Sequence, residues 1–158
     1  MTRYLILLFL LVSFFSCRPK EAVPKDNAAA RQSMLDADRA FSQLSEEKGM
    51  KNAFIEYIDS NGVLLRPNEL PVAGADAIDY LIQLNDSNYL LTWQPKTGVV
   101  AQSGDLGYTY GIYTLTPSQK DTILYGTYVS IWKKQADGRW KFVLDSGNEG
   151  ISEETLDR

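Results

Sequence analysis

The last third of the chain contains three runs in which β-branched and aromatic residues alternate with other residues, and no other feature restricts the fold as much. The runs are Leu106–Leu115, Ile123–Lys134 and Arg139–Asp145. Tyr, Thr, Ile and Val suit a pleated, half-buried surface. The Asp137-Gly138 pair between the second and third runs is a strong hairpin signal. The pattern predicts an antiparallel meander, so the preceding segments must cover one of its faces.

The register of the second hairpin decides which side chains share a face of this meander, because side chains alternate along a strand. A two-residue or four-residue loop around the Asp-Gly pair places Trp132 opposite Val143 and Ser130 opposite Asp145. A three-residue loop would instead turn Asp145 to the face opposite Trp132. We expect the first arrangement.

In the first hairpin, a connection centred near Gln119 places Tyr110 opposite Tyr128 and Tyr108 beside Ser130. One face of the meander then carries aromatic walls with a few polar tips: Tyr108, Tyr110, Ile112, Tyr128, Ser130, Trp132, Val143 and Asp145. Such a face suits either a small-molecule pocket or a core whose tyrosine hydroxyls reach water. The opposite face collects Tyr125, Val129, Ile131, Phe142 and Leu144 and predicts a homodimer.

Charge and histidine content exclude several classes of function. The formal net charge is −4 and the chain has no histidine. Nucleic-acid binding needs a concentrated basic patch, and none is present. Histidine is the usual general base at neutral pH and the commonest metal ligand, so catalytic triads and zinc sites built on it are excluded. We expect no metal and no cofactor.

The N-terminus has the pattern of an export signal. Arg3 precedes an apolar run, Tyr4–Phe15, which is too short to cross a bilayer and ends at Ser16 and Cys17. The pattern resembles a bacterial lipobox, so we expect residues 1–16 to be a signal peptide and Cys17 to carry a lipid that holds the protein to a membrane of the cell envelope. The alternative is a plain signal peptide with an incidental cysteine. Residues 17–27 are charged and contain proline, which predicts a tether.

The rest of the chain, residues 28–148, is predicted to form one α+β domain followed by a polar tail, residues 149–158. Ala30, Met34, Ala37, Phe41 and Leu44 give one apolar stripe on the first helix. The predicted helices are Ala28–Lys48, Lys51–Ile58 and Gly74–Leu84, and the additional strands are Val63–Arg66, Tyr89–Trp93 and Thr97–Gln102. Helices thus precede a mostly antiparallel sheet.

Several short segments resemble the SnoaL-like and nuclear transport factor two-like superfamily, in particular its branch of unknown function that is common in bacterial lipoproteins. They are Ala37–Phe41, Leu65–Pro67, Gly74 with Ala77 and Ile78, Ser103–Gly111, Ile131–Lys133, Asp137–Lys141, Leu144–Asp145 and Gly147–Asn148. The resemblance implies a cone-shaped roll in which helices pack on a curved sheet and a pocket opens at one end.

The resemblance also allows a test for catalytic residues. The base aspartate of ketosteroid isomerases falls at Arg66, and the acid that polarises their substrate falls at Ser130. Polyketide cyclases and scytalone dehydratase use histidine, which is absent. Epoxide hydrolases of this fold use an Asp, Arg, Asp set, which Asp38, Arg66 and Asp145 could imitate if all three point inward. No catalytic residue is therefore assigned.

The leading candidates for a site are Arg66 and Asp145, because an arginine beside a carboxylate could offer a fork to an anionic ligand. A structural ion pair is the alternative. Asp38 faces either the cleft or solvent, and Trp93 is a core or rim anchor. The full set of expected pocket residues is Asp38, Tyr57, Arg66, Trp93, Tyr108, Tyr110, Tyr128, Ser130, Trp132 and Asp145.

Taken together, the sequence favours a lipid-anchored, non-catalytic protein with a pocket for a small, partly apolar ligand. An enzyme that uses Asp and Arg chemistry in the same cleft is one alternative. A dimeric protein-interaction module is the other.

Overall fold

The computed structural model describes residues 27–119 and 122–156. The helices are α1 (Ala28–Lys48), α2 (Met50–Tyr57), α3 (Ala75–Gln83) and the short α4 (Glu153–Leu156). The strands are β1 (Ile58–Leu65), β2 (Val72–Ala73), β3 (Tyr89–Val100), β4 (Leu106–Pro117), β5 (Leu124–Lys134) and β6 (Trp140–Ile151). The expected signal peptide, Cys17 and nearly all of the expected tether lie outside the described residues.

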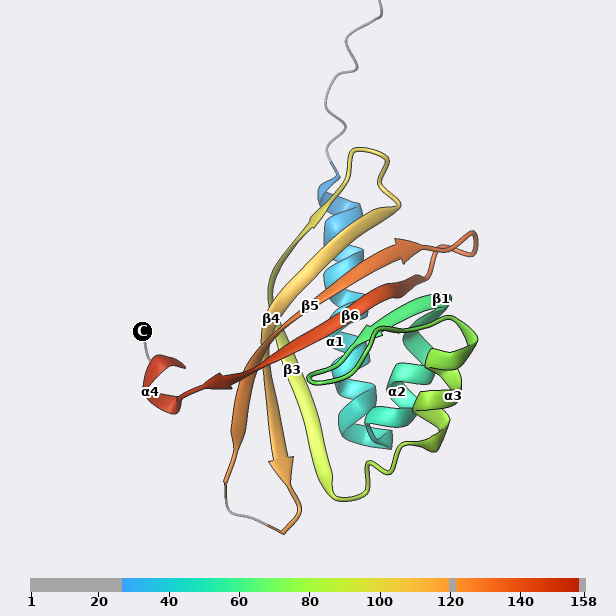
Figure 1. Ribbon diagram of the computed structural model, residues 1–158. Helices are drawn as coiled ribbons and strands as arrows, with labels where there is room; N and C mark the ends of the chain where they lie inside the picture. Colours follow the sequence, from blue (N-terminus) through green and yellow to red (C-terminus); the bar gives the residue numbers. More distant parts are fainter. Residues whose placement is uncertain (1–26, 120–121, 157–158) are drawn as a thin grey trace, which may run out of the picture.

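The six strands form one sheet in the order β2-β1-β6-β5-β4-β3. Neighbouring strands are antiparallel except β1 and β6, which are parallel. The long strands β3 to β6 curve around α1, and α2 and α3 lie beside the C-terminal half of that helix (Figure 1). The expected architecture, α+β with N-terminal helices packed on a curved, mostly antiparallel sheet, is confirmed.

Three boundaries differ from the sequence-based expectation. The strand expected to begin at Val63 already begins at Ile58, directly after α2. Residues 89–100 form a single strand whose register shifts between Pro95 and Thr97, because the proline breaks the ladder without ending it. Strand β6 continues through Ile151, so the first residues of the expected polar tail belong to the sheet.

The core lies between α1 and the face of the sheet that we call the inner face, which carries Tyr128, Ser130 and Trp132. Phe41 is at its centre, and its ring packs against five others: Phe54, Tyr57, Trp93, Trp132 and Phe142. The buried face of α1 includes the polar residues Asp38, Ser42 and Ser45. It is thus rotated relative to the apolar stripe, and Ala37 and Leu44 only flank the core.

These polar residues are buried on α1 because β3 is an edge strand whose outward-facing backbone groups need partners. The Trp93 backbone N–H donates to Ser42 Oγ at 2.8 Å, and Ser45 Oγ donates to the Leu91 carbonyl at 2.6 Å. The serines therefore complete the hydrogen bonding of an edge that would otherwise be exposed or buried without partners.

The second hairpin has the three-residue loop that was not expected. Gln135 and Arg139 close it through a 2.7 Å backbone bond, and Gly138 takes the positive φ of 88° that this turn requires. Trp132 consequently pairs with Phe142, which is fully buried on the inner face. The predicted pairing of Trp132 with Val143, and the placement of Phe142 on the opposite face, are wrong.

A β-bulge at Val143 then restores the other half of the predicted register. The pairing shifts between Ile131 and Trp132, so Ile131 lies opposite Leu144 and Ser130 lies opposite Asp145. One extra residue in β6 compensates for the odd loop length. Asp145 therefore stays on the same face as Trp132.

The register of the first hairpin differs by one residue from the prediction. Tyr128 lies opposite Gly111, and Tyr110 lies opposite Val129. Because side chains alternate along a strand, this shift turns Tyr108 and Tyr110 to the outer face of the sheet, where they are 41% and 44% exposed. Neither tyrosine belongs to the pocket that the sequence analysis proposed, and Ile112 follows them.

Candidate functional site

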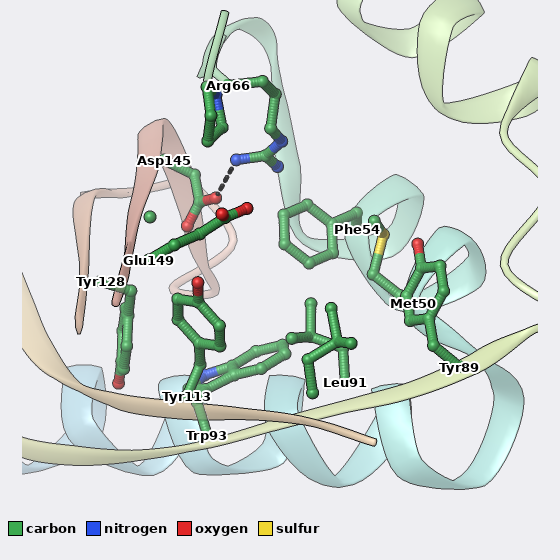
Figure 2. A pocket seen from close by; sticks show the side chains of 13 residues that line it. Met50, Phe54, Arg66, Tyr89, Leu91, Trp93, Tyr113, Tyr128, Asp145 and Glu149 are labelled. Atoms are coloured by element: carbon green, nitrogen blue, oxygen red, sulfur yellow. Dashed lines mark hydrogen bonds and ion pairs between the residues drawn. The ribbon is translucent and has the colours of Figure 1, made fainter. Parts of the chain in front are cut away.

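A cavity of about 170 Å³ opens at the end of the domain where α1 meets α2. Its walls are mainly apolar and come from α2, the end of β1 and the inner faces of β3 to β6 (Figure 2). The lining residues are Met50, Phe54, Arg66, Pro67, Tyr89, Leu91, Trp93, Tyr113, Leu115, Tyr128, Asp145, Gly147 and Glu149. A hollow of this composition, with a few convergent polar groups, is the usual form of a small-molecule site.

Arg66 and Asp145 form the ion pair that the sequence analysis proposed. Arg66 Nη1 donates to Asp145 Oδ1 at 2.8 Å, and Ser130 Oγ donates to Oδ2 at 2.7 Å. The side chains are 17% and 9% exposed, so the pair belongs to the interior wall of the cavity and not to the surface. Asp145 is held because β6 places it beside the end of β1, from which Arg66 follows.

The guanidinium does not present a fork to the cavity. Its carbon lies 5.2 Å from the centre of the Phe54 ring. Nη2 is buried and has no hydrogen-bond partner among the described residues, and a buried donor against an aromatic face is electrostatically favoured over one against an aliphatic wall. The expected bidentate capture of an anion by Arg66 is therefore not available in this arrangement.

Asp38 lies on the other side of the aromatic wall and is fully buried. Trp93 Nε1 donates to Oδ1 and the Tyr128 hydroxyl donates to Oδ2, each at 2.7 Å. Burial raises the pKa of this carboxyl, and hydrogen bonds from Tyr128, Thr109 and Trp93 oppose the rise only in part. Burial, and then the charge of Asp38, raise the pKa of Tyr128. Asp38 faces neither the cavity nor solvent.

The other predicted site residues divide into four groups. Arg66, Trp93, Tyr128 and Asp145 line the cavity. Ser130 and Trp132 are buried behind it, where Ser130 supports Asp145 and the Trp132 indole donates to Thr109 Oγ1 at 2.8 Å. Tyr57 stacks on Phe41 and borders a separate hollow beside Trp140. Tyr108 and Tyr110 lie on the outer face, as described above.

Sequence analysis missed several lining residues, most importantly Tyr113 and Glu149. Tyr113 shares the inner face of β4 with Gly111, so the one-residue error in register hid it. Glu149 was assigned to a polar tail. Its signal was the alternation of Asp145, Gly147 and Glu149, which puts all three on one side of a continuing strand.

The geometry of this part of the chain sets limits on the chemistry. Within residues 27–119 and 122–156, no group of three His, Cys, Asp or Glu side chains is placed to hold a metal ion. None of the described helices has the length and apolar composition that crossing a bilayer requires. The three residues that could imitate an Asp, Arg, Asp set are not assembled, because Asp38 contacts Trp93 and Tyr128 while Arg66 contacts Asp145.

Comparison with known proteins supports the fold. No family model and no curated protein matches the sequence. Solved structures do match. A nuclear transport factor two-like protein with a cystatin-like fold from Novosphingobium aromaticivorans gives a TM-score of 0.62 at 15% identity, over 82% of this chain and 88% of that chain. A ketosteroid isomerase-like protein from Erwinia carotovora gives 0.61 at 14%, over 81% and 99%.

A third structure, a nuclear transport factor two-like protein of unknown function from Pseudomonas putida, gives a TM-score of 0.60 at 12% identity, over 81% of this chain and 92% of that chain. At such identities the likeness concerns the fold, which hosts many unrelated activities. The chain therefore has the nuclear transport factor two-like fold that the sequence resemblance implied, and its function must be argued from its own cavity.

Proposed function

We propose that this protein is a lipid-anchored component of a bacterial cell envelope whose cavity binds a small, partly apolar ligand without converting it. The cavity carries the proposal. Five aromatic side chains form most of its wall, and its charged groups, Arg66, Asp145 and Glu149, gather on one side. An apolar body and a polar end of one ligand would match this division.

The state of the polar groups supports binding more than catalysis. Both oxygens of Asp145 already accept a hydrogen bond, one from Arg66 and one from Ser130, so the carboxylate is held in place by its neighbours. Asp38 is sealed behind Trp93 and Tyr128. An enzyme that uses Asp and Arg chemistry would need a second carboxylate beside this pair. Turnover of any substrate that Asp145→Asn abolishes would favour that alternative.

Ligand binding is tested by filling the cavity. A Cβ added at Gly147 would make only ordinary contacts, the nearest at 3.4 Å from the Tyr113 ring, so Gly147→Val fits β6 and projects into the space beside Asp145. Native mass spectrometry of the full chain should show a small molecule on the parent that Gly147→Val loses. Thr127→Val, on the exposed outer face of β5, is the matched control and should keep it.

Retention of the ligand by Gly147→Val would contradict the proposal. So would a parent that carries no small molecule and binds no single-ring compound in ligand-observed NMR.

The anchor is supported by Cys17 and by the direction in which the chain enters the domain. Asn27 Nδ2 donates to the Ala101 carbonyl at 2.6 Å, which fixes the start of α1 near the β3–β4 turn. The cavity is at the other end of this 21-residue helix, about 30 Å away at 1.5 Å per residue (Figure 1). An N-terminal lipid would leave the cavity facing away from the membrane. Cys17→Ala should abolish partitioning into the detergent phase, and unchanged partitioning would oppose the anchor.

A second copy of the chain is our proposed partner for the outer face. One row of neighbouring side chains across five strands is apolar: Val63, Leu144, Ile131, Tyr108 and Val99. A twofold pairing of this row would cover it on both copies. Ile131→Glu should then give monomers in light scattering, because a charge would be buried without a partner. A parent that is already monomeric would exclude this pairing.

A further inference from the structure

The charges at the cavity are unbalanced, and this imbalance bears on the class of ligand. Two carboxylates, Asp145 and Glu149, face one guanidinium, Arg66. Arg66 is fully engaged, since Nη1 contacts Asp145 at 2.8 Å and Nη2 is buried against Phe54 without reaching the cavity. The positive charge in the wall is therefore neutralised by its neighbour before any ligand enters.

Glu149 is the charged group that remains. Its carboxylate lies in the cavity between Arg66 and the aromatic rings (Figure 2). It makes no hydrogen bond or ion pair within residues 27–119 and 122–156 that the structure records, and the Tyr113 hydroxyl points toward it. The negative charge of Glu149 contributes, after burial, to raising the pKa of Tyr113, which places the two groups within electrostatic reach. The accessible charge of the cavity is thus negative.

The walls add to the same preference. Phe54, Trp93, Tyr113 and Tyr128 surround the space with aromatic rings, whose faces carry partial negative charge and attract cations. The Tyr128 hydroxyl points away toward α1, where it is occupied by Asp38, so this residue offers the cavity its ring (Figure 2). Rings and free carboxylate together favour an ammonium over a neutral or anionic group.

The volume limits the body of the ligand. About 170 Å³ is close to the ~150 Å³ of an apolar cavity that accepts benzene. We propose that the cavity binds a small organic ammonium ion with one ring, its cation held by Glu149 beside Asp145 and its ring packed against Leu91 and Trp93. This inference rests on the proposed function, that the cavity is a ligand site.

The test compares three probes of one shape and different charge, benzylamine, benzyl alcohol and benzoate, by isothermal titration calorimetry on the full chain. Benzylamine should bind most tightly and benzoate most weakly. Glu149→Gln keeps the shape and removes the charge, so the Kd for benzylamine should rise about tenfold, as for the loss of one charge-assisted hydrogen bond, while that for benzyl alcohol stays the same. Glu46→Gln, on the exposed side of α1, is the matched control and should change neither.

Two results would overturn the assignment of an ammonium ligand. One is benzoate binding at least as tightly as benzylamine, and the other is an unchanged benzylamine Kd in Glu149→Gln. If benzyl alcohol still binds in those cases and Gly147→Val abolishes its binding, the cavity remains a ligand site and only the ligand class is wrong. If no probe binds the parent, both this inference and the proposed function fail.

Discussion

The two buried aspartates of this domain, Asp38 and Asp145, are held in different ways. Asp38 lies on α1 behind the aromatic wall and is met by neutral donors, Trp93 and Tyr128. Asp145 lies on the wall of the cavity and is met by a cation, Arg66, as well as by Ser130. Burial without a cation raises the pKa of Asp38, which shows that neutral hydrogen bonds do not fully replace the lost hydration of a carboxylate.

The difference separates a structural carboxylate from one that shapes the site. Asp38 ties α1 to two strands through side chains that also line the cavity, so its effect on a ligand is indirect. Asp145 lines the cavity itself and fixes the guanidinium whose charge it neutralises. Substitutions at the two positions should therefore differ in size, in pH dependence and in their consequences for binding.

The largest effect is expected for Asp145→Ala. It leaves the guanidinium of Arg66 buried without its partner, and breaking a buried pair in this way typically costs about 3–5 kcal/mol. The free energy of unfolding from urea titration measures the loss. The double variant Arg66→Met with Asp145→Ala is the control and should recover much of it, because no unpaired charge remains. A change within about 0.5 kcal/mol would place Asp145 effectively at the surface.

The next effect concerns Asp38 and depends on pH. Because its folded pKa is raised above the ordinary value of 3.8, its contribution to stability is fully present below that value and is lost as the pH rises through the raised pKa. The stability of the parent relative to Asp38→Asn should therefore fall as the pH increases from about 3.8 upward, by about 1.4 kcal/mol for each unit by which the pKa is raised.

Urea titrations of both proteins at several pH values give this difference. Taking the difference cancels other titrating groups, such as Asp59, whose lowered pKa acts in the opposite sense. A difference that does not vary with pH would mean that Asp38 is not desolvated, and the contrast with Asp145 would then disappear.

The smallest effect is expected for Ser130→Ala. It removes one donor to Asp145 but leaves Arg66 in contact with the carboxylate, so the loss of stability should be about 1 kcal/mol. Thermal unfolding compared with Thr127→Ala, on the exposed outer face of the same strand, provides the reference. A loss as large as that of Asp145→Ala would show that Ser130, and not Arg66, is the main support of the carboxylate.

Much of the fold follows from local pattern and was predictable. The predicted helix Ala28–Lys48 coincides with α1, and the three alternating runs of the last third became β4, β5 and β6. Amphipathic spacing and β-branched content act within a few residues, so one sequence suffices to read them. The lack of histidine and of a basic patch also belongs to the sequence alone and limits the chemistry without any structure.

The composition of the site was decided by tertiary packing. A one-residue difference in register moved Tyr108 and Tyr110 out of the cavity and Tyr113 into it, and a bulge at Val143 kept Asp145 inside despite an odd loop. Because side chains alternate with a period of two, an error of one residue inverts a whole strand. Neither the loop length nor the bulge is marked by local propensity. Both depend on how Trp132 and Phe142 pack together under α1, which only the folded chain determines.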